Sequence, residues 1–112
     1  MEERRKLVMR EILLGFWKIH ILHHAAEGGV VGHWMLQELR RHGYDVSPGT
    51  LYPLLNRMEK NGWLRGEQDP ERGPKSRKSY YLTPEGDEVL KLVGRQAREL
   101  CREVGEDTSR MR

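Results

Sequence analysis

Apolar side chains recur at helical spacing along the first quarter of the chain. Between Leu7 and Ala26 they fall mostly three or four positions apart, and no proline occurs before Pro48. This period predicts one long helix, which Gly28 and Gly29 would end. The recurring positions are Val8, Ile12, Phe16, Ile19 and Leu22.

A second, shorter helix is expected from about Val31 to His42. Arg40 and Arg41 supply the cationic last turn that favours a helix C-terminus, and Gly43 suits the position that follows it. Its apolar positions are Trp34, Met35, Leu36 and Leu39.

The stretch SPGTLYPLLNRMEKNGWL, from Ser47 to Leu64, predicts a third helix. Ser47 is a typical N-cap and Pro48 a typical first helical residue. Pro53 conflicts with a regular helix because it removes an interior backbone hydrogen bond, so either Thr50 is the effective cap or the first turn is loose. The predicted apolar side is Leu51, Leu54, Leu55 and Met58, and Asn61-Gly62 would end the helix.

After this helix the pattern changes. The stretches WLRGEQD and RKSYYLT each alternate over a few residues and predict a β-hairpin whose tip lies within PERGPKS. Thr83 and Pro84 then repeat the cap-and-proline signal of a helix start. Apolar residues follow at steps of four, four, three and four, which gives the last helix an apolar stripe.

The order helix, helix, helix, hairpin, helix predicts a mostly α fold with a small β-hairpin, namely a winged helix-turn-helix plus a C-terminal dimerisation helix. We divide the chain into a DNA-binding domain with its N-terminal helix (1–82), a dimerisation helix (83–107) and a disordered tail (108–112). The chain has 112 residues, which suits one compact domain.

Charge is segregated along the chain, although the net charge is only +3. Residues 72–78 hold four cations and no acid, whereas residues 85–107 hold seven acids against four cations. A basic hairpin tip favours a polyanionic partner. The single cysteine, Cys101, excludes an internal disulfide, and no stretch approaches the roughly 20 apolar residues of a membrane span. We therefore expect a cytoplasmic protein that does not enter membranes.

The same motifs resemble the PadR family of bacterial transcriptional regulators. SPGTLYPLLNRMEKNGWL, followed by a charged loop and KSYYLTPEG, matches the family's hallmark stretches in order, from about Ile12 to Leu90. The resemblance implies a homodimeric repressor whose first and last helices form the dimer interface, released from DNA by a small hydrophobic or aromatic effector. The final helix looks short, as in the subgroup with one C-terminal helix.

The outward side of the third predicted helix carries residue types that contact DNA. Asn pairs with adenine, Arg with guanine, and Lys or a helix N-terminus with phosphate. A solvated face is the alternative, and for Tyr52 only the resemblance implies a phosphate contact. The candidate contacts are Ser47, Gly49, Thr50, Tyr52, Pro53, Asn56, Arg57 and Lys60 on the helix, with Arg72, Lys75, Arg77, Lys78 and Tyr80 on the hairpin.

One of Tyr80 and Tyr81 should be buried and the other exposed, since neighbours on a strand point to opposite sides. The expected DNA is a double-stranded inverted repeat, which matches a two-fold dimer. The expected dimer interface comprises Ile12, Phe16, Ile19, Val89, Val93, Ala97, Leu100 and Val104.

Trp17 is a candidate for lining an effector cavity, although core packing is the commoner role for a tryptophan and is expected of Trp34 and Trp63. His20, His24 and Glu27 lie at helical spacing with His23 beside them, but a structural role is commoner than metal binding, so we predict no metal and no cofactor. Because no catalytic motif occurs, we predict no enzyme activity. A winged-helix module that binds an acidic protein is the alternative to a DNA-binding one.

Overall fold

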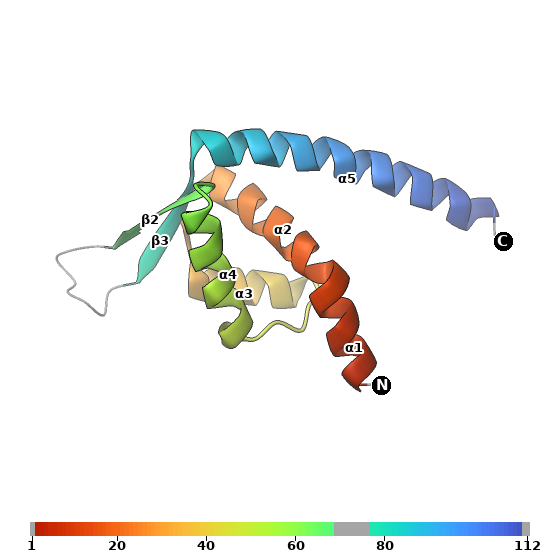
Figure 1. The fold of residues 1–112 in the computed structure, drawn as a ribbon, viewed down its shortest axis with the longest axis horizontal. Coiled ribbons are helices and arrows are strands. Elements are labelled where there is room, and N and C mark those ends of the chain that lie inside the picture. Colours follow the sequence, from red (N-terminus) through yellow and green to blue (C-terminus); the bar gives the residue numbers. More distant parts are fainter. Residues whose placement is uncertain (1, 69–76, 111–112) are drawn as a thin grey trace.

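The computed structural model describes residues 2–68 and 77–110. Three helical segments run on from one another at the start: α1 (Glu2–Val8), a π-helical segment η1 (Met9–Leu13) and α2 (Leu14–Glu27). They form the long first helix that the sequence predicts (Figure 1).

The remaining elements give a winged helix-turn-helix, as predicted. Helices α3 (Gly32–Arg41) and α4 (Pro48–Lys60) make the helix-turn-helix pair, and strands β2 (Leu64–Gln68) and β3 (Lys78–Leu82) make the wing. Helix α5 (Pro84–Arg110) follows and crosses α2 before extending away from the other elements (Figure 1). The expected helix from 31 to 42 is thus correct to within one residue at each end.

The sheet has a third strand that the sequence did not predict. Strand β1 (Val30–Val31) pairs antiparallel with β3, so the strand order is β1-β3-β2. Val30 lies opposite Tyr80 and Leu64 opposite Leu82. A strand of two residues is too short to show alternation, and only its pairing with β3 reveals it.

The core lies between α2, α3, α4 and the sheet. The apolar side of α4 is nearly inaccessible to solvent, with Leu51 and Leu55 at 0% exposure and Leu54 and Met58 at 1%. Buried side chains of this kind each contribute roughly 1.5–3 kcal/mol relative to an exposed position. The other helices contribute chiefly Trp17, Ile21, Leu22, Ala25, Met35, Leu36 and Leu39.

The turn between the sheet and α5 is fixed by Thr83. Its hydroxyl donates to the Gly62 carbonyl and accepts from the Gly86 amide at 2.9 Å, which caps α5. A side chain at Gly86 would collide with the Trp63 carbonyl, so only glycine allows this close approach.

Four local expectations need correction. Helix α4 begins at Pro48, because the Ser47 carbonyl already accepts hydrogen bonds from the Thr50 and Leu51 amides at 3.1 and 3.0 Å. Pro53 lies within this helix. The proline therefore lies inside a helix that is neither loose nor capped at Thr50. Ser47 does not cap α4 with its side chain, since its hydroxyl lies 3.3 Å from the Thr50 hydroxyl instead.

The other two concern the end of the chain and one tryptophan. Helix α5 continues to Arg110, so the final helix is the longest of those described and residues 108–110 are not an irregular tail. Trp34 is 45% exposed rather than in the core. Among the residues described, no helix is long and apolar enough to cross a membrane.

Candidate nucleic-acid interface

The outward side of α4 is polar and open to solvent. Asn56, Arg57 and Lys60 are exposed, as are Gly49, Tyr52 and Pro53. Ser47 is exposed just before the helix, and Thr50 is half-buried. Within residues 2–68 and 77–110, neither Arg57 nor Lys60 takes part in an ion pair. Both cations are therefore available to an external anion.

Tyr52 is held against the start of α3. A side chain at Gly32 would collide with the Tyr52 ring, which shows how closely the ring lies over this glycine. The ring remains 41% exposed. The phenol is thus fixed by packing on one side and presented to solvent on the other, an arrangement suited to a polar contact.

Asn56 is connected to the sheet. The Tyr80 hydroxyl donates a long hydrogen bond, 3.4 Å, to Asn56 Oδ1. A carbonyl oxygen has two lone pairs, so this contact orients the amide without using all of its capacity. Asn56 therefore keeps the donor and acceptor that bidentate pairing with adenine requires.

Tyr80 itself is not a surface residue. It is 4% exposed and belongs to the core, and burial raises the pKa of its phenol. The predicted direct DNA contact by Tyr80 does not fit this placement, because its ring packs inward and its hydroxyl donates to Asn56. Tyr81 is the partly exposed member of the pair, with the Arg65 guanidinium 5.0 Å from its ring centre.

An ion pair joins the end of α4 to the wing. Lys78 Nζ donates to Glu59 Oε1 at 2.7 Å, and the Gly66 amide donates to Glu59 Oε2 at 3.0 Å. The hydrogen bond from Lys78 lowers the pKa of Glu59, and the same contact raises the pKa of Lys78. Lys78 was expected to meet phosphate, but part of its charge is already neutralised within the chain.

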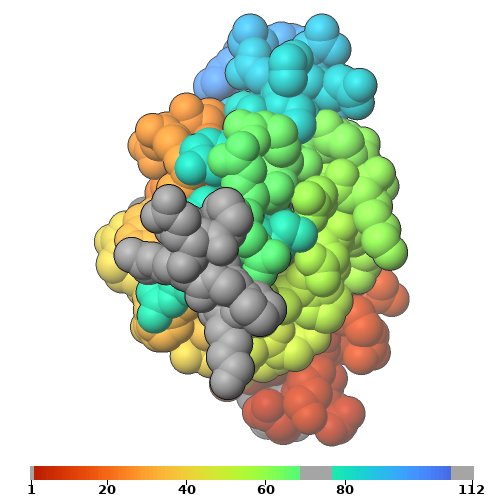
Figure 2. All heavy atoms as spheres, turned by 90° about the vertical axis from the view of Figure 1, so that its left-hand side faces the viewer, coloured from red at the N-terminus to blue at the C-terminus, as the bar shows by residue number. Residues whose placement is uncertain are grey.

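Helix α4 and the wing strands share one face. Figure 2 shows α4 beside strands β2 and β3 on the same side of the molecule. Arg77 is exposed immediately before β3, whereas Arg72 and Lys75 lie outside the described residues. Sequence reasoning missed Glu59 and Arg65, whose roles depend on contacts across elements that no periodic pattern encodes.

A second surface lies between α2 and α5. It is an open, mainly apolar groove whose lining includes Phe16, Ile19, Tyr44, Val93 and Leu100. Phe16 is 42% exposed and Leu100 51% exposed. Five of the residues predicted for a dimer interface line this groove, namely Phe16, Ile19, Val93, Ala97 and Leu100. Ile12, Val89 and Val104 do not line it, and Val89 and Val93 also pack against the core of their own chain.

Trp17 does not line this groove. It is 2% exposed in the core, and its ring packs edge-on against Tyr44 with ring centres 6.0 Å apart. Its indole N–H is buried without a hydrogen-bond partner among the described residues. The suggestion that Trp17 itself would stack on an effector is not supported by this placement, while its neighbour Tyr44 does reach the groove.

Comparison with known proteins agrees with this architecture. The family described as Transcriptional regulator PadR-like family matches residues 21–92. Transcriptional regulator Rv3488 of Mycobacterium tuberculosis is 50% identical over 96 residues, which cover 86% of this chain and 89% of that protein.

Solved structures are similar over most of their length. A Streptococcus transcriptional regulator has a TM-score of 0.75 and 32% identity, covering 88% of this chain and 97% of that one. A PadR family transcriptional regulator from Eggerthella lenta has a TM-score of 0.73 and 33% identity, covering 95% of this chain and 96% of that one.

Proposed function

Because the chain belongs to the PadR-like family of transcriptional regulators, we propose that it is a DNA-binding repressor that acts as a homodimer on an inverted-repeat operator. The family and its relatives are regulators rather than enzymes, as the sequence led us to expect. Such a regulator works in the cytoplasm, where bacterial DNA lies.

The observation that carries the proposal is the shared face of α4 and the wing. Asn56 and Arg57 are base-reading types on the exposed side of α4, and Lys60 lies one turn beyond Asn56. The contact of Glu59 with Lys78 and Gly66 fixes the wing strands relative to α4. This arrangement supports a binding mode in which α4 enters the major groove and the wing contacts the adjacent backbone.

Dimerisation is supported by apolar surface that this chain does not cover. Phe16 is 42% exposed and Leu100 51% exposed, and both line the groove between α2 and α5. Ile12, in the preceding segment η1, is 57% exposed. Soluble monomers rarely leave a large contiguous apolar patch open. A second copy, whose α5 lies along this groove, would bury these side chains. In the proposed dimer the two α4 helices would lie about one turn of DNA apart, roughly 34 Å.

The proposed effector is a small hydrophobic or aromatic compound that binds at the dimer interface, in the part of the groove next to Tyr44, and weakens DNA binding. Tyr44 lines the groove and contacts Trp17 in the core, so occupancy should change Trp17 fluorescence indirectly. Linkage requires reciprocity, so such a compound must bind less tightly to the protein–DNA complex than to free protein.

Titration of labelled duplexes at several salt concentrations tests the DNA-binding role. We expect saturable binding that weakens steeply with salt and prefers particular sequences. Arg57→Ala should lose affinity and sequence preference, whereas Arg102→Ala, on the exposed side of α5, should change neither. The proposal would be contradicted if the protein bound every duplex with the same affinity and that affinity did not change with salt concentration.

A further inference from the structure

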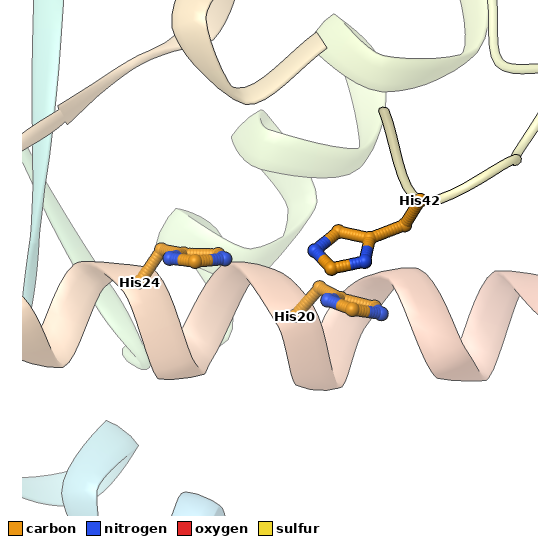
Figure 3. Close-up of side chains that lie close together, drawn as sticks. All are labelled: His20, His24 and His42. Carbon is orange, nitrogen blue, oxygen red and sulfur yellow. The ribbon is translucent and has the colours of Figure 1, made fainter. Parts of the chain in front are cut away.

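Three histidines and one glutamate meet between α2 and the end of α3. His20 and His24 lie one turn apart on α2, and His42 directly follows α3 (Figure 3). One ring nitrogen of each histidine lies within 4.8 Å of the others. Glu38 Oε2 lies 3.3 Å from His24 Nε2 and 3.2 Å from His42 Nε2.

The spacing of these four groups is that of a site built across two helices. His20 and His24 form one i,i+4 pair on α2, and Glu38 on α3 forms another with His42, which directly follows that helix. The His20 and His42 ring centres are 4.8 Å apart. The three histidine nitrogens lie near one another, and Glu38 lies beside two of these histidines, so side-chain movement would be needed to bring all four donors onto one ion.

The residues around the donors hold two of them in place. His24 Nδ1 lies 2.9 Å from Glu27 Oε1, which leaves Nε2 turned toward Glu38. Metal-binding histidines commonly donate their second ring N–H to a carboxylate in this way. Arg41 holds Glu38 through Nε to Oε1 at 2.9 Å and Nη2 to Oε2 at 2.8 Å.

We propose that His20, His24, Glu38 and His42 bind one divalent transition-metal ion of the zinc class. Three imidazoles and one carboxylate suit Zn²⁺ or Co²⁺ in tetrahedral geometry, with ligand distances of about 2.0–2.2 Å. The ion would join α2 to the first helix of the helix-turn-helix pair. This site goes beyond the proposed repressor function and does not depend on it.

A neighbouring group, His23, His24 and Glu27, could compete for the same ion because it shares His24. Its other two side chains are 60% and 62% exposed, whereas those of His24, Glu38 and His42 are 12%, 10% and 39% exposed. The cluster of His20, His24, Glu38 and His42 has a fourth donor, and its lower exposure leaves less water to compete with the ligands for the ion. We therefore assign the ion to the cluster that contains His42.

Metal titration of the chelator-treated, full-length chain tests the assignment. Zinc should bind at one ion per chain in competition with a chromogenic chelator, and cobalt should give the intense visible absorption of a tetrahedral complex without thiolate charge transfer. Loss of a group that only supports a ligand typically lowers metal affinity about 10- to 100-fold. His20→Ala and His42→Ala remove ligands themselves, so each should lower zinc affinity by about 100-fold or more.

Matched controls separate this site from other donors. His33→Ala removes an exposed histidine elsewhere on α3, His23→Ala breaks only the competing group, and Cys101→Ser removes the thiol. All three should keep wild-type zinc affinity. Zinc should also raise the melting temperature of the wild type and of these controls, but not of a His42→Ala protein with an unchanged circular dichroism spectrum.

Three results would overturn the proposal: no saturable binding of zinc, octahedral cobalt spectra, or equal affinity in wild type and His42→Ala. Loss of binding in His23→Ala with retention in His42→Ala would move the site to His23, His24 and Glu27 and refute the assignment made here.

Discussion

Helices α4 and α5 have the same kind of amphipathic sequence but different environments. The apolar side of α4 is covered by its own chain, with Leu54 at 1% and Leu55 at 0% exposure. The distal half of α5, residues 97–106, extends past the core, and Leu100 is 51% exposed (Figure 1). The difference follows from length: a helix of 27 residues is about 40 Å long, so its C-terminal part extends beyond a small core.

The comparison shows what an apolar stripe can and cannot tell. An apolar stripe shows that one side of a helix is to be buried, but not whether its own chain or a second copy buries it. Substitutions in the two stripes should therefore separate folding from association.

The largest effect is expected for Leu54→Asp. This change places an unpaired carboxylate in the core of the helix-turn-helix, at a cost of more than about 4 kcal/mol. Chemical denaturation and circular dichroism would measure the loss. Leu92→Asp, at a position 51% exposed on α5, is the control and should leave the free energy of unfolding nearly unchanged.

The next effect concerns association. Ile12→Asp combined with Leu100→Asp should leave the chain folded but raise the dimer dissociation constant about a thousandfold or more, because four apolar contacts are lost per dimer. Sedimentation equilibrium measures this change. Arg102→Asp introduces the same side chain on the other side of α5 and should leave the dimer intact; a double variant that stays dimeric would show that the interface lies elsewhere.

A smaller effect is expected on the open side of α4. Asn56→Ala should lose about 1–3 kcal/mol on the preferred duplex and little on random DNA. Lys60→Ala should weaken both duplexes alike and reduce the salt slope by about one. Parallel titrations of the two variants would separate the roles, and undiminished preference in Asn56→Ala would remove this residue from base reading.

The smallest effect is expected where α4 meets the wing. Glu59→Gln should cost about 1 kcal/mol, since the ion pair with Lys78 is partly exposed. The pKa of Glu59 is lower in the folded chain than in the unfolded one, so its contribution is present above about pH 4.5 and declines as the pH falls further. Unfolding titrations between neutral and acid pH should show a smaller decline in Glu59→Gln than in the wild type.

Much of the fold could be predicted because the signals are local. The apolar period of Leu51, Leu54, Leu55 and Met58 is enough to orient α4, and the alternation in KSYYLT is enough to place β3. The two-residue strand β1 could not be predicted, because its existence depends on pairing with β3 alone.

The candidate site was predictable in part for the same reason. Exposure of Asn56, Arg57 and Lys60 follows from helical period, but the inward direction of Tyr80 depends on the sheet's orientation on the core. The sequence also placed Lys78 among phosphate contacts without its partner Glu59, 19 residues away. His42 meets His20 and His24 only because α3 packs back against α2, which the sequence pattern does not reveal.

Selection of preferred duplexes from a random DNA pool, followed by the mass of the complex on the enriched sequence, tests the central claim most directly. We predict a palindrome with half-sites about one helical turn apart, roughly 34 Å, bound by two chains. Enrichment of no sequence, or of a single half-site bound by one chain, would contradict the account.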